Sequence, residues 1–330
     1  MKVGFSLSPG GLLLPFHLGA LECLTHQGQL VPGQTPVAGS SAGAIAAMTH
    51  GCGISPKCVL EATVDVSEQA ARMGGARGRL LPLLQQKLEQ LVGDEEFAHL
   101  TQESPLHYSQ CIEQQQQSQQ QQQQETTIGI AYRELFPQPR NVLQTTFESR
   151  QDLFQATANS CMFPFFATNG PCLWDRSRNN GSLWHSRLVV DGFFTVPRDR
   201  FGCPDLTVNH HPPVDVDMDR DLHVEVDMSP LQEKKDTVVP PPPPQPYSRF
   251  QEVDRIIAIS VFPAGPIGLT AFDKHNVIAP CSHEDDASLL DLVRIATQAT
   301  SRDELTHIYQ LGYQAAERWC RQELELEPRK

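Results

Sequence analysis

The chain has 330 residues, of which 39% are hydrophobic and 20% charged, and this composition is that of a globular protein with a sizeable core. Its formal net charge of −13 excludes a nucleic-acid partner, because no basic stripe is present to displace phosphate counterions. The same charge disfavours tight docking on strongly anionic lipid surfaces and leaves neutral or zwitterionic lipids as the accessible ones.

Targeting signals are also excluded by the sequence. No run of roughly 18 apolar residues occurs, so no transmembrane helix is expected. Prolines and glycines interrupt the apolar N-terminal segment at residues 9–15, which is untypical of a signal peptide. The nine cysteines are scattered without a CxxC pair, and this pattern favours reduced thiols. We therefore expect a cytoplasmic protein without a signal peptide.

Strands and helices alternate in the N-terminal part of the chain. Residues 2–8 carry apolar side chains at alternate positions and predict a strand, which a proline-glycine loop separates from a helix over 16–26. Residues 35–38 predict a second strand, and the alanine-rich residues 42–50 predict a second helix. Strands that alternate with helices in this way indicate a mostly parallel sheet.

The alternation continues to the C-terminus. Helical periodicity covers residues 55–72 and 79–92. The leucine stripe of residues 79–92 suits either core packing or an amphipathic lid. The other predicted elements are strands over 126–131 and 141–147, a helix over 150–160, strands over 187–190 and 255–262, and a final helix that opens with a capping box at 301–304. Together they predict an α/β fold.

Three segments have a composition unlike the rest. A glutamine tract over residues 114–124 cannot bury a core face and predicts a disordered insertion. Residues 214–228 alternate apolar with acidic side chains, which favours a half-buried strand or hairpin over a calcium loop, since the glycine and closing glutamate of such a loop are missing. The proline run at 240–244 is either a spacer or a ligand for a partner protein with an aromatic groove.

The pentapeptide Gly39-Ser40-Ser41-Ala42-Gly43 lies between the second predicted strand and the second predicted helix. A serine on a sharp strand-to-helix turn is a nucleophile elbow, whose strained backbone exposes the hydroxyl group. Small neighbours are required there, because the turn leaves no room for a side chain at the flanking glycines. The sequence therefore predicts Ser41 as a nucleophile, with a plain helix cap as the alternative.

A serine nucleophile also needs groups that stabilise the oxyanion it creates. The loop Pro9-Gly10-Gly11-Leu12 follows the first predicted strand and precedes a helix, so the N–H groups of Gly10, Gly11 and Leu12 can turn toward a developing negative charge. A phosphate-binding loop would need a Gly-Lys-Ser/Thr ending or a GxGxxG pattern, and neither is present. An ordinary loop remains the alternative.

The general base is harder to assign from the residues. An α/β-hydrolase triad has several strands before its elbow and a histidine after it, whereas only about two strands precede Ser41. No histidine stands out by its local context, and each suits a surface or packing role better. Asp191-Gly192 follows a short apolar strand and is either a catalytic aspartate or a two-residue hairpin turn.

These segments resemble the patatin-like phospholipase family over most of the chain. The glycine loop, the first helix and the GxSxG elbow follow the order and spacing of that family, and residues 12–19 look like its adiponutrin-type branch. Residues 160–166 resemble the family's serine-to-proline segment, and residues 190–197 resemble its D-G-G motif with a following proline. The resemblance implies a three-layer α/β/α fold with a mostly parallel central sheet, as one domain over 1–330 with insertions at about 113–125 and 209–249.

The resemblance also implies a function. Asp191 becomes the partner of Ser41 in a Ser-Asp dyad, and no metal or organic cofactor is needed. The implied activity is that of a lipid acyl hydrolase, a carboxylic ester hydrolase of phospholipase A or triacylglycerol lipase type, which cleaves phospholipids, galactolipids or acylglycerols. Such an enzyme meets its substrate at a membrane or lipid-droplet surface, so peripheral association is expected.

Three residues depart from the family pattern. Pro9 stands at the first glycine of the loop, and it has no N–H to offer an oxyanion. Leu13 stands where the family has a basic side chain, and Phe193 replaces the second glycine of the aspartate motif. Because the loss of one oxyanion donor costs on the order of a hundredfold to a thousandfold in rate, the alternative is a catalytically impaired lipid-binding or scaffold protein with the same fold.

Overall fold

A computed structural model describes residues 2–101, 127–175, 187–207, 253–281 and 288–326. The glutamine tract, the alternating residues 214–228, the proline run and both predicted insertions lie outside the described residues. In the described part, no helix is long and apolar enough to cross a membrane.

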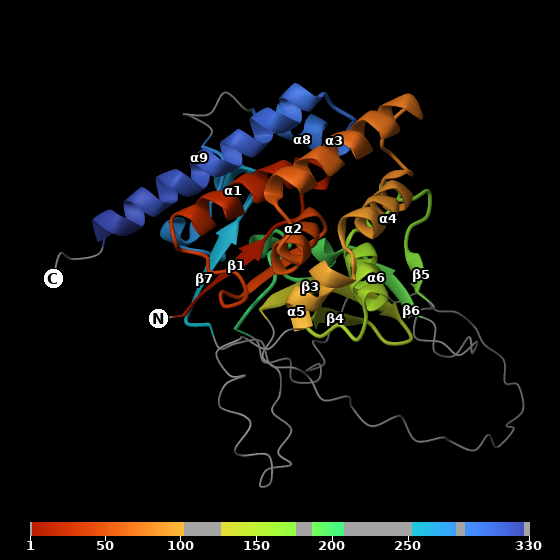
Figure 1. The fold of residues 1–330 in the computed structure, drawn as a ribbon, viewed down its shortest axis with the longest axis horizontal. Coiled ribbons are helices and arrows are strands. Elements are labelled where there is room, and N and C mark those ends of the chain that lie inside the picture. Colours follow the sequence, from red (N-terminus) through yellow and green to blue (C-terminus); the bar gives the residue numbers. More distant parts are fainter. Residues whose placement is uncertain (1, 102–126, 176–186, 208–252, 282–287, 327–330) are drawn as a thin grey trace, which may run out of the picture.

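The described residues form an eight-stranded sheet in the order β5-β6-β3-β2-β1-β7-β8, with β4 paired to β3 (Figure 1). The pairs β1–β2, β2–β3, β1–β7 and β7–β8 are parallel, and β4 and β6 run antiparallel to β3, as does β5 to β6. The strands are β1 (Val3–Leu7), β2 (Val37–Ser40), β3 (Ile128–Phe136), β4 (Arg140–Gln144), β5 (Leu173–Asp175), β6 (Arg187–Val190), β7 (Arg255–Ile259) and β8 (Val277–Ile278).

Helices flank this sheet, so the prediction of an α/β/α fold with a mostly parallel sheet is confirmed (Figure 1). The helices are α1 (Leu14–His26), α2 (Ala42–Gly51), α3 (Pro56–Arg72), α4 (Leu80–Leu91), α5 (Asp94–Thr101), α6 (Arg150–Ser160), α7 (Ala264–Ile267), α8 (Leu289–Thr297) and α9 (Arg302–Leu326). Short 3-10 turns lie at Gly11–Leu13, Gly192–Thr195, Arg198–Arg200 and Lys274–Asn276.

Helices α1 and α9 pack closely against each other on one face of the sheet (Figure 1). A Cβ atom at Gly19 of α1 would lie 2.9 Å from the backbone nitrogen of Tyr313, and a Cβ atom at Gly312 of α9 would lie 2.7 Å from the carbonyl carbon of Phe16. Only glycine fits at both crossing points, because a side chain would collide with backbone rather than with a movable side-chain end. The predicted capping box is present, since Ser301 and Glu304 exchange side-chain to backbone hydrogen bonds of 3.2 Å.

Some predicted boundaries were wrong. The second strand begins at Val37 rather than at residue 35, because Pro36 has no N–H to donate to the ladder. Helices α5 and α8 were not predicted, and neither was the antiparallel pairing of β4, β5 and β6 at one side of the mostly parallel sheet. Of these strands, β6 is the one that positions a predicted site residue, because its last residue, Val190, precedes Asp191.

Candidate active site

Ser41 has the backbone geometry of a nucleophile elbow. It lies between the last residue of β2 and the first of α2, with φ 54° and ψ −120°, one of three non-glycine residues with positive φ in the described part of the chain. A Cβ atom at Gly43 would lie 2.6 Å from the carbonyl oxygen of Leu7, and one at Gly39 would overlap the backbone of Gly43. The two glycines are therefore required by the close approach of strand and helix, and this close approach holds the strained serine in place.

Ser160, the last residue of α6, holds the elbow from its other side. The backbone N–H of Ser41 donates to Ser160 Oγ at 2.9 Å, and the Ser160 hydroxyl donates to the carbonyl oxygen of Ala131 on β3 at 2.6 Å. The side chain of Ser160 is fully buried. Sequence reasoning noticed this serine only as the start of a segment that resembles the family, and its bond to the nucleophile's backbone was not predicted.

Asp191 follows β6 and caps the 3-10 turn Gly192–Thr195. Its Oδ1 accepts a hydrogen bond from the N–H of Phe193 at 2.8 Å, and its own N–H donates to the carbonyl oxygen of Met162 at 2.9 Å. Its Oδ2 is buried and has no hydrogen-bond partner of normal geometry among the described residues. The carboxyl group is thus anchored through one oxygen while the other is left available.

Burial controls the charge of Asp191. Loss of hydration raises the pKa of the carboxyl group from 3.8 to about 7, while the hydrogen bonds from Phe193 and from the Ser41 side chain act in the opposite direction. The Ser41 hydroxyl is thus a neighbour of the carboxyl group, but Oδ2 accepts no hydrogen bond among the described residues. A base with a pKa near 7 can both take and return a proton at neutral pH.

Gly192 explains why the Asp-Gly pair lies here. A Cβ atom at this position would lie 2.5 Å from Ser40 Cβ and would overlap the carbonyl oxygen of Ala131. The chain continues from β6 into a 3-10 turn, so the alternative interpretation of the pair as a two-residue hairpin turn is wrong. Gly192 instead lets Asp191 come next to the elbow.

The glycine loop lies beside the elbow, and Gly10, Gly11, Leu12 and Ser41 line the same cavity. Gly11 has φ 55°, and a Cβ atom there would overlap the carbonyl oxygen of Ala296 on α8. The 3-10 turn Gly11–Leu13 starts here and runs on into α1, so the N–H groups of Gly11 and Leu12 have no partner within the helix.

His17 supports the loop from inside the protein. It is fully buried, and burial lowers its pKa to about 4, so the imidazole is neutral. Its Nε2 lies 2.8 Å from the carbonyl oxygen of Ser8, which can only accept, so Nε2 carries the proton and donates. The expectation of a packing role for this histidine fits this contact, and sequence reasoning missed that the residue it holds adjoins the glycine loop.

The cavity over Ser41 has a volume of about 390 Å³ and a mostly apolar wall. Residues of α2, α3 and α4 and several aromatic rings line it. The apolar residues that line it include Ile45, Val59, Val66, Leu80, Leu81, Leu84, Leu88, Leu91, Phe163, Phe166, Phe193, Phe201 and Phe262. The leucine stripe of α4 therefore forms cavity wall as well as core.

The three departures from the family pattern have different structural consequences. Leu13 is completely buried in the main core, so its side chain contributes packing and no charge. Phe193 lines the cavity and packs edge-on against Phe194 and Phe201, with ring centroids 5.3 and 5.5 Å apart. Pro9 also lines the cavity.

The described residues contain no group of three or more His, Cys, Asp or Glu side chains that could hold a metal ion. A family model described as patatin-like phospholipase matches residues 5–199, a range that includes the glycine loop, the elbow and Asp191. Because this match covers more than half of the chain, the protein belongs to the patatin-like phospholipase family, a family of lipid acyl hydrolases. No curated protein matches the chain significantly.

Proposed function

We propose that this protein is a lipid acyl hydrolase that cleaves fatty-acyl esters with a Ser41–Asp191 dyad. The observation that carries the proposal is the combination of a strained serine and a neighbouring buried carboxyl group, with Ser41 in the wall of an apolar cavity. A nucleophile exposed on a sharp turn and a base with a pKa near 7 both suit acyl transfer. The proposal includes one patatin-like domain over residues 1–330 and a cytoplasmic location.

In the first half of the reaction, ionised Asp191 takes the proton of the Ser41 hydroxyl while Oγ bonds to the ester carbonyl carbon. The negative charge then moves to the carbonyl oxygen, and the N–H groups of Gly10, Gly11 and Leu12 stabilise it. When the tetrahedral intermediate collapses, the bond to the alcohol oxygen breaks, and the proton on Asp191 goes to the leaving alkoxide. An acyl-enzyme ester on Ser41 remains.

In the second half, a water molecule replaces the alcohol. Asp191 takes a proton from the water as its oxygen attacks the acyl carbon, the same N–H groups stabilise the oxyanion, and the bond to Ser41 Oγ breaks. Ser41 recovers its proton from Asp191 and the fatty acid leaves. The family's lipid substrates suit the wall of the cavity, since apolar side chains from α3 and α4 can bury an acyl chain. Phospholipids, galactolipids and acylglycerols all carry such a chain.

Peripheral association with a membrane or lipid droplet is part of the proposal. Three phenylalanines on the loops around Asp191 are unusually exposed for their size: Phe163 at 40%, Phe165 at 52% and Phe194 at 36%. The rings of Phe163 and Phe194 are stacked, with centroids 5.8 Å apart. Exposed apolar groups next to a binding cavity are typical of a surface that contacts another apolar phase.

The test is covalent labelling with a fluorophosphonate, followed by ester hydrolysis assays. Wild-type protein should be labelled on Ser41 by mass spectrometry, and Ser41→Ala should lose both labelling and hydrolysis. The matched control is Ser55→Ala, because Ser55 is exposed and its hydroxyl makes no capping hydrogen bond. Failure of folded wild-type protein to label at Ser41 would contradict the proposal.

A second candidate function is that of an impaired lipid-binding or scaffold protein. Two observations favour it: Asp191 Oδ2 has no partner of normal geometry among the described residues, and Pro9 removes one donor from the glycine loop. Lipid binding that survives in Ser41→Ala, together with no measurable turnover by the wild type, would select this alternative.

A further inference from the structure

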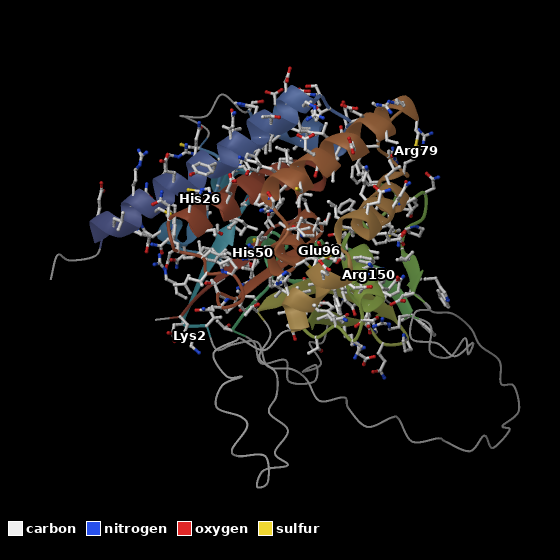
Figure 2. All side chains as sticks on the ribbon, viewed as in Figure 1. Lys2, His26, His50, Arg79, Glu96 and Arg150 are labelled. Carbon is white, nitrogen blue, oxygen red and sulfur yellow. The ribbon has the colours of Figure 1, made fainter. Side chains whose placement is uncertain are left out.

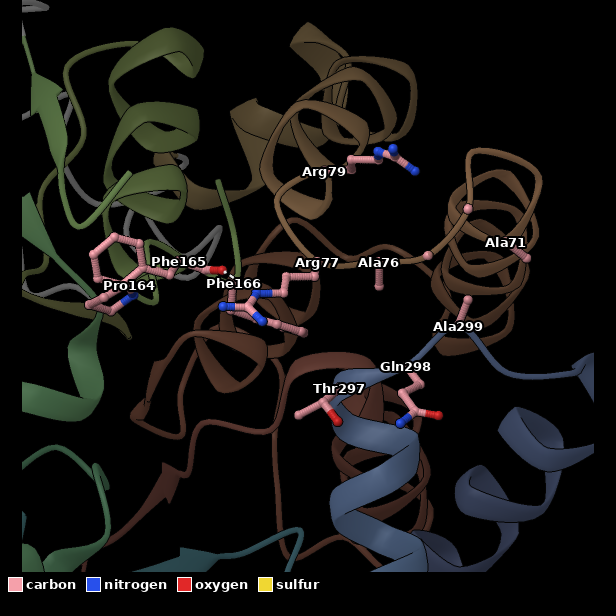
Figure 3. A pocket seen from close by; sticks show the side chains of 12 residues that line it. Ala71, Ala76, Arg77, Arg79, Pro164, Phe165, Phe166, Thr297, Gln298 and Ala299 are labelled. Carbon is pink, nitrogen blue, oxygen red and sulfur yellow. Dashed lines mark hydrogen bonds between the residues drawn. The ribbon is translucent and has the colours of Figure 1, made fainter. Parts of the chain in front are cut away.

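A second cavity, of about 780 Å³, lies beside the cavity of Ser41 and has no part in the chemistry proposed above. It is bordered by the turn between α3 and α4, by residues 164–166, and by residues 297–299 at the end of α8 (Figure 3). Phe166 and Thr297 border both cavities, so the two are direct neighbours. We call them the inner cavity, which contains Ser41, and the outer cavity.

Two arginines give the outer cavity its charge. Arg77 donates from Nε to the carbonyl oxygen of Phe165 at 3.1 Å, and Figure 3 shows its side chain extending toward Phe165 and Phe166. Arg79 lies at the periphery of the molecule, beside the turn between α3 and α4 (Figure 2). Among the described residues neither guanidinium group forms an ion pair, whereas nearby Arg72 pairs with Glu68 at 3.1 Å. The outer cavity therefore carries two positive charges in a chain of net charge −13.

The turn that carries these arginines is open because it is rich in glycine. Gly74, Gly75 and Gly78 have φ values of 88°, 125° and 76°, which side-chain-bearing residues rarely adopt. A Cβ atom at Gly75 would meet nothing within 4 Å, and one at Gly74 would lie 3.5 Å from Nη1 of Arg79. The guanidinium group of Arg79 therefore borders open space over the glycines, and this space can hold a polar group of a ligand.

We propose that the outer cavity is a headgroup subsite for the phosphate of a phospholipid, with Arg77 on its side next to Phe165 and Arg79 on its side next to Gly74 as the two cations that attract the phosphate. This inference rests on the proposed function, because it takes the acyl chain to lie in the inner cavity. Arginine presents a planar set of donors that matches phosphate oxygens, and charge-assisted hydrogen bonds of this kind are about twice as strong as neutral ones. An acylglycerol offers these arginines no anion, so the subsite selects phosphate-bearing lipids over acylglycerols with the same chains. Zwitterionic phospholipids fit best, since the net charge of −13 repels anionic lipid surfaces.

The first experiment compares two substrates with identical short acyl chains, phosphatidylcholine and diacylglycerol, both kept monomeric. We expect Arg79→Gln and Arg77→Gln each to lower the ratio of the two kcat/KM values, phosphatidylcholine to diacylglycerol, by about tenfold. Arg72→Gln is the matched control, because its side chain lies at the same turn, is 75% exposed and already has an ion-pair partner. It should leave the ratio unchanged. An unchanged ratio in both test variants would overturn the proposal.

The second experiment measures binding without turnover. In a Ser41→Ala background, calorimetric titration with short-chain phosphatidylcholine should show about tenfold weaker binding when Arg79→Gln is added. If Ser41 does not label and no ester is hydrolysed, but binding still depends on Arg79, the dyad is wrong and the subsite stands. If Ser41 is required for hydrolysis while binding ignores both arginines, the subsite is wrong and the dyad stands.

Two further outcomes are decided by the same variants. Arg77→Gln loses the hydrogen bond to the carbonyl oxygen of Phe165 and can therefore fail to fold. In that case Arg79→Gln alone tests the proposal, because the Arg79 side chain makes no hydrogen bond within the described part of the chain. If Arg79→Gln relieves inhibition by added fatty acid but leaves the substrate ratio unchanged, the arginines bind the carboxylate of the product. That result would overturn the assignment to phosphate.

Discussion

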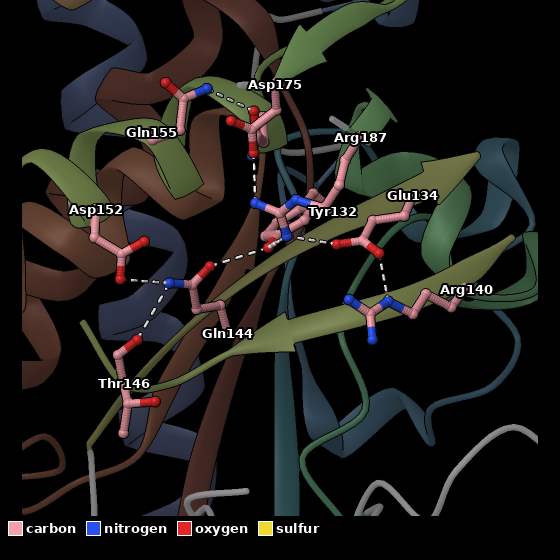
Figure 4. A network of polar contacts seen from close by, with 10 residues as sticks. Tyr132, Glu134, Arg140, Gln144, Thr146, Asp152, Gln155, Asp175 and Arg187 are labelled. Carbon is pink, nitrogen blue, oxygen red and sulfur yellow. Dashed lines mark hydrogen bonds and ion pairs between the residues drawn. The ribbon is translucent and has the colours of Figure 1, made fainter. Parts of the chain in front are cut away.

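Buried carboxyl groups lie at both ends of strand β6, but those at its start are paired with an arginine and the one beyond its end is not. At the first residue of the strand, Arg187 contacts two buried carboxylates, Glu134 of β3 at 2.6 Å and Asp175 of β5 (Figure 4). Just beyond its last residue, Asp191 has no cation among the partners that the structure gives it, and its pKa is raised to about 7. Burial alone therefore does not give a carboxyl group a raised pKa. The pKa rises where the buried carboxyl group also lacks a counter-ion.

The paired end is also a network. The hydroxyl of Tyr132 donates to Oε1 of Gln144 at 3.0 Å, and Arg187 donates to that hydroxyl at 3.3 Å (Figure 4). Glu134 contacts Arg140 as well, so each oxygen of its carboxylate faces an arginine. A buried carboxylate whose oxygens are all paired is a poor general base, because taking up a proton would break its ion pairs.

The largest effect that we expect is on catalysis by Asp191→Asn. Asparagine keeps the shape and the bond from Phe193 but cannot take a proton, so kcat should fall by about a hundredfold to ten-thousandfold. Stability should change in the opposite direction. The folded-state pKa lies above the unfolded value of 3.8, so wild-type stability falls as the pH rises toward about 7, and the substitution removes this loss.

Urea unfolding at pH 5 and pH 8 measures that change. At pH 8 the charged carboxylate costs up to about 4 kcal/mol, from about three units of pKa shift, so Asp191→Asn should be the more stable protein there and gain less at pH 5. An Asp191→Asn variant that is less stable than wild type at pH 8 would mean that the carboxylate is paired, and the contrast between the two ends of β6 would be lost.

At the paired end the expected effect is on stability. Arg187→Met should lower the free energy of unfolding by about 3–5 kcal/mol, because it leaves Glu134 and Asp175 buried without their shared cation. Arg140→Met is the control, since Arg140 also contacts Glu134 but its side chain is 46% exposed, and it should cost less than half as much. Adding Glu134→Gln and Asp175→Asn to Arg187→Met should recover part of the loss. No recovery would mean that Arg187 acts through packing and not through its charge.

The pH dependence of the reaction gives the next contrast. The base must be ionised to take a proton, so kcat/KM for an uncharged ester should rise about tenfold per pH unit below about 7 and level off above it, which makes it about a hundredfold lower at pH 5. The pKa of His17 and that of His50 are both lowered to about 4 by burial, so neither ring titrates near pH 7. A flat profile between pH 5 and pH 8 would assign the proton transfer to a different group.

The parts of the candidate site differ in how well the sequence predicts them. The elbow is built from residues that are adjacent in the sequence, so small residues between a strand and a helix were sufficient to predict the geometry of Ser41. Asp191 was ambiguous, because a hairpin turn and a catalytic aspartate use the same two residues. Its distinguishing features are full burial and the absence of a cation beside it among the described residues, and these exist only once β6 has paired with β3.

The ion cluster could not be predicted from local patterns. Tyr132, Glu134, Asp175 and Arg187 come from three strands. Tyr132 and Glu134 lie beyond the end of the strand predicted over 126–131, no strand was predicted around Asp175, and only Arg187 belongs to a predicted strand. The pairing of β3 with β6 shifts register between Glu134 and Phe136, so even a correct strand assignment does not give the contacts. The contacts depend on the register between strands that are far apart in the sequence, and residue type alone does not determine that register.

Adjacent residues at the end of α6 connect the two regions and give the smallest predicted effects. Asn159 donates to Asp175 at 3.1 Å on the paired side, whereas Ser160 accepts the backbone N–H of Ser41 at 2.9 Å on the reactive side. Asn159→Ala should therefore cost about 1 kcal/mol of stability and change kcat less than twofold. Ser160→Ala should cost a similar or somewhat larger amount, about 1–3 kcal/mol, and also lower kcat about tenfold, because the elbow N–H loses its acceptor. Equal kcat values for the two variants, measured at matched folded fractions, would show that the elbow is held by its glycines alone.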